Sequence, residues 1–169
     1  AITDGNGGAA RASFSIALPD QAATNQAPEI LSSTLAPVIE DRESAGYITA
    51  TDPDGDTLIF ALKDGAGPSK GSVTFGSGGH FTYTPAANVH GPDAFTITVA
   101  DGVNAPVESH FSFAIAPVND APIAKADSGF TVRAGHTLNI AASSLLQNDR
   151  DIDGDALSIA SISSVNGGK

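Results

Sequence analysis

The chain has 169 residues without a cysteine, methionine or tryptophan, and 19 acidic residues against eight lysines and arginines give a formal net charge of -11. The lack of cysteine excludes a disulfide framework, a thiolate zinc site and a cysteine nucleophile. Because like charges repel, we expect neither nucleic acid nor an anionic membrane surface as a partner, whereas excess carboxylate suits a hard divalent cation in an extracellular setting.

Short runs in which apolar side chains alternate with small or polar ones predict half-buried strands. In chain order they cover residues 14–18, 58–62, 73–75, 81–83, 95–99 and 111–115. Turns rich in glycine and aspartate, such as Asp54-Gly55 and Asp101-Gly102, separate several of these runs, and no segment shows a sustained helical stripe with caps. The sequence therefore predicts an all-β fold of antiparallel Greek-key β-sandwich repeats in tandem.

Three parts of this pattern occur twice, at the spacing of one small domain. Residues 52–58 (Asp-Pro-Asp-Gly-Asp-Thr-Leu) return as 151–157, residues 25–28 (Asn-Gln-Ala-Pro) return as 119–122, and Asp4-Gly5 returns as Asp101-Gly102. We therefore predict the C-terminal strands of one repeat in residues 1–26, a complete repeat in 27–120 and the N-terminal part of another in 121–169. Partial sandwiches leave strand edges open, so we also expect strand-mediated self-association of the chain.

Aspartates at alternate positions are predicted to converge on a cation, because alternate side chains of an extended segment point to the same side. Calcium accepts six to eight oxygens with loose geometry and fits an irregular loop better than magnesium does. Neither cluster is an EF-hand, because the position of its bidentate glutamate holds Lys63 in one and Ile162 in the other. The alternative is a turn-rich loop whose carboxylates face water. The two clusters are Asp52, Asp54 and Asp56, and Asp151, Asp153 and Asp155.

Several motifs in the same order make residues 52–122 resemble the bacterial cadherin-like tandem repeats of large repeats-in-toxin adhesins and surface proteins. The matching segments are residues 52–58, 67–73, 81–85, 94–102 and 117–122, the last reading Pro-Val-Asn-Asp-Ala-Pro. Residues 145–157 resemble the start of a related bacterial immunoglobulin-like repeat. The resemblance implies a cadherin- or immunoglobulin-like sandwich and a role in cell adhesion, including biofilm-type attachment.

The resemblance also implies where calcium binds, since cadherins hold it where consecutive domains meet. It implies a glutamate near the first strand, an Asp-x-Asp, a linker Asn-Asp and a late aspartate, which are Glu40, Asp52 with Asp54, Asn119 with Asp120, and Asp101. For the junction after residue 117 the implied ligands are Glu40, Asn119, Asp120, Asp151 and Asp153. The junction before residue 27 is weaker, because its linker reads Asn25-Gln26 and lacks the aspartate. Residues 81–85 also depart from cadherins, which carry another acidic ligand motif near this place.

We expect a calcium-stiffened extension or adhesion module of a secreted or cell-surface bacterial adhesin, with neighbouring repeats of the same polypeptide as partners. The alternative is a calcium-dependent carbohydrate- or receptor-binding module, whose partner would be a glycan or a cell-surface protein. Against this alternative, tryptophan is absent and Tyr83 is predicted to be buried, so the usual aromatic platform for sugars is missing.

No enzymatic activity is expected, because the four histidines form no recognisable triad pattern and His80 and His90 are predicted to lie in exposed turns. No apolar run approaches the roughly 20 residues that span a bilayer, so we expect no membrane insertion. The sequence also shows no signal peptide, and we expect any export signal to lie elsewhere in a longer polypeptide.

Overall fold

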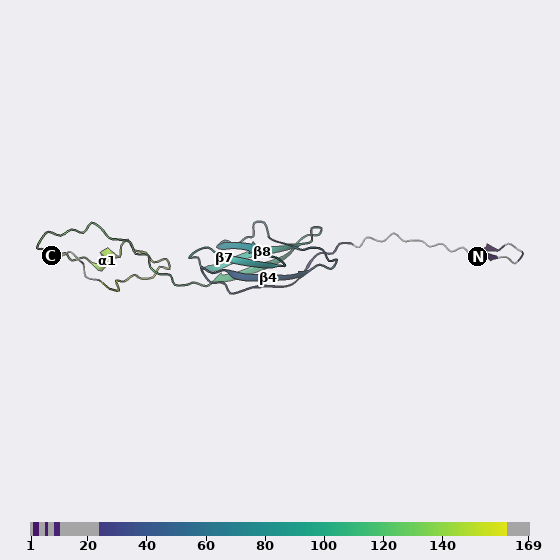
Figure 1. Cartoon of the computed structure of the whole chain (residues 1–169), viewed down its shortest axis with the longest axis horizontal. Helices are drawn as coiled ribbons and strands as arrows, with labels where there is room; N and C mark the ends of the chain where they lie inside the picture. The colour runs from purple at the N-terminus through teal and green to yellow at the C-terminus, as the bar shows by residue number, and fades with distance from the viewer. Residues whose placement is uncertain (1, 4–5, 7–8, 11–23, 162–169) are drawn as a thin grey trace.

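The computed structural model describes residues 2–3, 6, 9–10 and 24–161 (Figure 1). Near the N-terminus, β1 (Ile2–Thr3) pairs antiparallel with β2 (Ala9–Ala10). The strand predicted at residues 14–18 and the Asp4-Gly5 turn lie outside the described residues, so the prediction for residues 1–26 rests on the sequence there.

Seven further strands form a sandwich of two antiparallel sheets. One sheet has the order β3-β4-β7-β6 and the other has the order β5-β8-β9, which is the strand arrangement of a constant-type immunoglobulin domain. This confirms the predicted antiparallel β-sandwich. The strands are β3 (Glu29–Leu35), β4 (Ser44–Thr51), β5 (Ile59–Leu62), β6 (Gly71–Phe75), β7 (His80–Pro85), β8 (Gly91–Ala100) and β9 (Val107–Ile115).

The core lies between the two sheets and is built from the alternating residues that the sequence indicated. Tyr83 of β7 is fully buried, and its ring stacks on that of Phe95 of β8, with the ring centroids 5.9 Å apart. Phe81 meets Phe111 edge to face at 5.1 Å. These rings join the sheets, and burial of each large side chain contributes about 1.5–3 kcal/mol. The buried core comprises Val38, Ile48, Phe81, Tyr83, Phe95, Ile97, Val99, Phe111 and Ile115.

The first two strands of the sandwich, β3 and β4, were not predicted, and their sequences explain why. In β3 the pairing register shifts between Ile30 and Ser32, so that Leu31 bulges out and is 58% exposed. Such a bulge breaks the period of two and protects an edge strand from pairing with another chain. In β4 the inward positions include Ser44 and Gly46, and a side chain at Gly46 would overlap the ring of Phe81.

The segment between β3 and β4 crosses from one sheet to the other. Ile39 forms a parallel bridge with Ala116, just after β9, with hydrogen bonds of 2.9 Å from Ala116 N to Val38 O and from Glu40 N to Ala116 O. The crossing therefore brings Glu40 beside the point at which the chain leaves the sandwich.

Residues 121–161 extend from the end of the sandwich at which β9 finishes (Figure 1). They contain helix α1 (Ala142–Leu145) and an antiparallel bridge between Ile123 and Arg150, and are otherwise irregular. The Asp149 carboxylate accepts a hydrogen bond from Lys125 N at 2.8 Å. The assignment of this segment to the N-terminal part of another repeat stays a prediction. Its exposed large apolar side chains are Ile123, Phe130, Val132, Leu138, Ile140 and Ile159.

Candidate metal centres

The predicted ligands lie at opposite ends of the sandwich. Asp52 directly follows β4, and Asp101 directly follows β8. Because β8 and β9 pair antiparallel, with Gly91 opposite Ile115, the residues that follow β9 lie at the other end, with Glu40. We call the end with Asp52 and Asp101 the upstream junction and the end with Glu40 the downstream junction.

At the downstream junction, Glu40, Asp41 and Asp120 each offer a carboxylate oxygen, and these oxygens lie within 4.8 Å of one another. Glu40 is only 1% exposed, and its Oε2 accepts a hydrogen bond from Val118 N at 3.0 Å. Asp153 joins the group from residues 121–161, because its Oδ2 accepts a hydrogen bond of 2.7 Å from Asp120 N. Three separate segments of the chain thus meet at one place.

The charges at this place repel one another. Burial and then the neighbouring charges of Asp41, Asp153, Glu40 and Asp151 raise the pKa of Asp120 above its ordinary value. The five carboxylates form what we call the downstream cluster. In the part of the chain that the structure describes, the one ion pair joins Lys63 and Glu108. Neither of them belongs to this cluster, so no described lysine or arginine forms an ion pair with it.

Asp120 Oδ2 is buried and has no hydrogen-bond partner among the described residues. A buried carboxylate oxygen without a partner is costly, and a bound cation would satisfy it. Every charged side chain in the downstream cluster offers oxygen, which is the donor that calcium prefers. The residues present therefore fit a calcium ion.

The two Asp-x-Asp-Gly-Asp loops have the same local structure. Asp52 Oδ1 accepts hydrogen bonds from Asp54 N at 2.9 Å and from Asp56 N at 3.2 Å. The second loop repeats both contacts, at 3.0 Å from Asp153 N and 3.2 Å from Asp155 N to Asp151 Oδ1. The glycine in each loop has a φ of 82°, which favours glycine at that position. Asp56 and Asp155 thus take part through backbone N–H groups, and no described contact brings their carboxylates into a metal-ligating group.

The linker at the upstream junction makes the same backbone contact as the linker at the downstream junction, but it has the neutral Gln26 in the place of Asp120. Gln26 N donates to Asp54 Oδ2 at 2.7 Å, the same contact that Asp120 N makes with Asp153. Within residues 24–161, Asp52 Oδ2 is buried without a hydrogen-bond partner, as Asp120 Oδ2 is. Gln26 brings no carboxylate, so the described residues bring fewer acidic oxygens to this junction than to its counterpart.

The carboxylate of Asp101 accepts hydrogen bonds from four amide N–H groups. Its Oδ1 accepts from the backbone N–H groups of Val103 and Asn104, both at 2.8 Å, and its Oδ2 accepts from the side-chain amides of Asn104 and Asn25, also at 2.8 Å. The Val103 N–H, followed by the Asn104 side chain, contributes most to lowering the pKa of Asp101 to about 2. Asp101 therefore fixes the linker to the sandwich through Asn25.

Sequence reasoning missed two residues at these junctions, Asp41 and Asn104. Asn104 could have been found from its position three residues after the late aspartate, where an amide can reach back to a carboxylate. Asn119, a predicted ligand, directs its side-chain amide to Asp120 O at 3.0 Å and so shapes the linker. The β7 segment contains no acidic residue, and its Phe81 and Tyr83 belong to the core.

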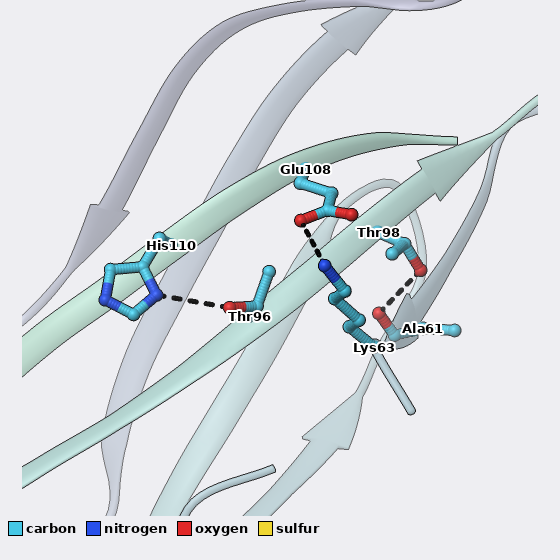
Figure 2. Close-up of polar contacts among 6 residues, drawn as sticks. All are labelled: Ala61, Lys63, Thr96, Thr98, Glu108 and His110. Atoms are coloured by element: carbon cyan, nitrogen blue, oxygen red, sulfur yellow. Dashed lines mark hydrogen bonds and ion pairs between the residues drawn. The ribbon is translucent and has the colours of Figure 1, made fainter. Parts of the chain in front are cut away.

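The outer face of the β5-β8-β9 sheet carries polar contacts between neighbouring strands (Figure 2). His110 Nδ1 lies 3.1 Å from Thr96 Oγ1, and Lys63 pairs with Glu108 at 2.8 Å. Thr98 Oγ1 donates to Ala61 O at 3.2 Å. These contacts tie the strands of the sheet together, and in the described residues none of them gives His110 a carboxylate partner.

Over the described residues, no helix has both the length and the hydropathy needed to cross a bilayer.

Comparison with known families agrees with the fold and with the resemblance read from the sequence. Residues 25–117 match the family model of the bacterial cadherin-like domain, and residues 118–169 match that of the cadherin-like domain. No curated protein sequence matches the chain with significance. Cadherin-like domains generally bind calcium, and the bacterial ones are typically extracellular, which indicates an adhesion or extension module. The chain belongs to the bacterial cadherin-like domain family.

Proposed function

We propose that this chain is a calcium-stiffened extension and adhesion module of a secreted or cell-surface bacterial adhesin, and that it has no enzymatic activity. The observation that carries the proposal is the Oδ2 of Asp120, which is buried within the downstream cluster and has no hydrogen-bond partner in the described part of the chain. It lies in the linker between the sandwich and the segment that follows, where a cation would limit movement of one against the other.

Each segment has a distinct part in this mechanism. Glu40 is fixed by the bridge between Ile39 and Ala116 and by the Val118 N–H, so the sandwich offers a rigid carboxylate. Asp120 offers the linker carboxylate, and the hydrogen bond from its N–H to Asp153 orients the loop of the following segment. Calcium would supply the positive charge that holds these carboxylates together. The partners that we propose are the neighbouring repeats of the same polypeptide, without nucleic acid and without membrane insertion.

The proposal predicts that millimolar calcium raises the thermal midpoint of unfolding relative to excess chelator. At a Kd of about 10⁻⁴ to 10⁻³ M, each site would stabilise the folded state by about 0.4 to 1.4 kcal/mol, or a few degrees. Asp151→Asn/Asp153→Asn should remove part of this rise, and Asp52→Asn/Asp54→Asn should remove a smaller part, because the described residues bring fewer carboxylates to the upstream junction.

Two controls sharpen this measurement. Asp64→Asn changes the charge of an exposed Asp-Gly turn away from both junctions and should leave the calcium-dependent rise intact. Magnesium at the same concentration should give a smaller rise, because it demands tighter octahedral geometry. Identical melts in calcium and in chelator, with no heat of calcium binding by calorimetry, would contradict the proposed function.

A further inference from the structure

We propose that Asp41 is an additional ligand of the cation at the downstream cluster and that Asn88 positions it. This inference rests on the proposed function and extends it to a residue that the family resemblance did not imply. It concerns the turn between β3 and β4 and the loop between β7 and β8, which meet beside the linker.

Asp41 shares the cluster with Glu40 because of an unusual backbone conformation. Adjacent side chains of an extended segment point to opposite sides, so two consecutive acidic residues would not ordinarily face one ion. Asp41 has a φ of 58°, in the left-handed region, and a tight turn closes around it with a hydrogen bond of 3.3 Å from Arg42 N to Ile39 O. This turn brings the carboxylate oxygens of Asp41 and Glu40 within 4.8 Å of each other and of Asp120.

Asn88 holds Asp41 in this conformation. Its backbone N–H donates to Asp41 Oδ1 at 2.9 Å, and it has a φ of 55°. Among the described residues, Asp41 and Asn88 are the two non-glycine residues with positive φ, and they contact each other. A left-handed residue costs about 1 kcal/mol, although Asp and Asn tolerate it better than other side chains do.

The loop that carries Asn88 is itself anchored. Ala86 N donates to Lys70 O at 2.8 Å, and Lys70 Nζ donates to His90 O, also at 2.8 Å. Asn88 therefore projects its N–H from a fixed frame. Asn88 holds Oδ1 of Asp41, whereas no described residue donates a hydrogen bond to Oδ2.

Two further observations point to an ion at this place. Glu40 is 1% exposed, and its charge has a single neutral donor, the Val118 N–H, and no cationic partner in the described part of the chain. Asp120 Oδ2 is buried, and no residue that the structure describes forms a hydrogen bond with it. Asp41 adds a third negative charge beside these two, with its carboxylate oxygen within 4.8 Å of those of Glu40 and Asp120. Three carboxylates this close together repel one another, and a cation that binds all three would stabilise them.

Calcium binding to the full chain, followed by isothermal calorimetry, tests the inference. Asp41→Asn should raise the calcium Kd about tenfold, since affinity follows the number of charged ligands and the order around them. Asn88→Val should raise it severalfold, because a β-branched residue resists the left-handed conformation. Asn88→Gly keeps the N–H and accepts that conformation, so its Kd should stay near that of the wild type. Asp64→Asn is the matched charge control and should change the Kd less than twofold.

Thermal unfolding separates a ligand from a merely structural residue. In chelator, Asp41→Asn should melt at or above the midpoint of the wild type, because a repelling charge is gone, whereas in millimolar calcium it should melt below it. An unchanged Kd in Asp41→Asn, with the wild type binding calcium, would overturn this inference and leave the proposed function standing. A wild-type chain that binds no calcium would overturn both.

Discussion

The Asp93→Asn variant is expected to lose about 3 kcal/mol of folding stability. Asp93 is only 6% exposed and joins both sheets through four hydrogen bonds. Its Oδ1 accepts from the backbone N–H and hydroxyl of Ser69, both at 2.9 Å, and its Oδ2 accepts from Lys70 N at 3.1 Å and from the Tyr83 hydroxyl at 2.7 Å. Asparagine would turn an NH₂ group toward one backbone N–H and one hydroxyl. The hydroxyl can rotate to accept from it, but the buried N–H loses its acceptor and the charge that strengthens all four bonds is gone. Chemical denaturation measures the loss.

The same network predicts the pH dependence of stability. Burial alone would raise the pKa of Asp93, but the hydrogen bonds from Tyr83, Ser69 and Lys70 outweigh it and hold the pKa below its ordinary value. A carboxyl with a lowered folded pKa stabilises the protein above its unfolded pKa, which is about 3.9, and this contribution is lost as the pH falls through the folded value. The stability difference between wild type and Asp93→Asn should therefore shrink below about pH 4. A loss in Asp93→Asn no larger than that of the exposed control Asp64→Asn would contradict this account.

Gly79→Ala is the second large effect, at about 4 kcal/mol. Gly79 is buried, has a φ of 85°, and accepts a hydrogen bond on its carbonyl from Ile48 N at 2.9 Å. A methyl group at this position would overlap the carbonyl oxygen of Ile48 and approach the ring of Phe60. Because the obstacle is backbone, relief requires β4 and the β6-β7 turn to separate.

The neighbouring glycine provides the control for this substitution. Gly78 also has a positive φ, 65°, but a methyl group there would enter open space. Gly78→Ala should therefore cost only the left-handed conformation, about 1 kcal/mol. Equal losses of stability in the two variants would show that steric overlap at Ile48 is not the cause.

The strands that could be predicted from the sequence are those whose core-facing residues are large and apolar. The strands β7, β8 and β9 were evident because aromatic and aliphatic residues such as Phe81, Tyr83 and Phe95 occupy the inward positions. The strands β3 and β4 were hidden, because Leu31 bulges out of the register and Gly46 makes room for a ring that comes from another strand. The sequence of β4 alone does not reveal that the ring of Phe81 fills the space beside Gly46.

For the candidate sites, local spacing and family resemblance indicated Glu40, Asp120 and Asp153, and the structure brings these three together. Their role as ligands stays a prediction. Asp41 could not be predicted, because adjacent side chains of an extended segment point to opposite sides and the positive φ that changes this is not visible in the sequence. The contact from Asn88 that accompanies this conformation is also distant in the sequence. Asp56 and Asp155 also stay predicted ligands, and the structure shows that their backbone N–H groups shape the loops.

The two junctions of the sandwich differ in a way that bears on its mechanics. The upstream linker is tied by amides, since Asn25 and Asn104 both donate to Asp101. The downstream linker carries Asp120 within a cluster of like charges. We therefore expect calcium to change the stiffness of the downstream junction more than that of the upstream one.

The most direct test of calcium stiffening is the distribution of distances across the downstream junction. Because the chain has no cysteine, Ser112→Cys on β9 and Ser128→Cys in the following segment give a unique pair of exposed positions for nitroxide spin labels. Pulsed electron resonance should give a narrow distribution in millimolar calcium and a markedly broader one in chelator, and Asp120→Asn should be broad in both. The same width with and without calcium, in a chain that binds calcium, would contradict the claim that the ion stiffens the module.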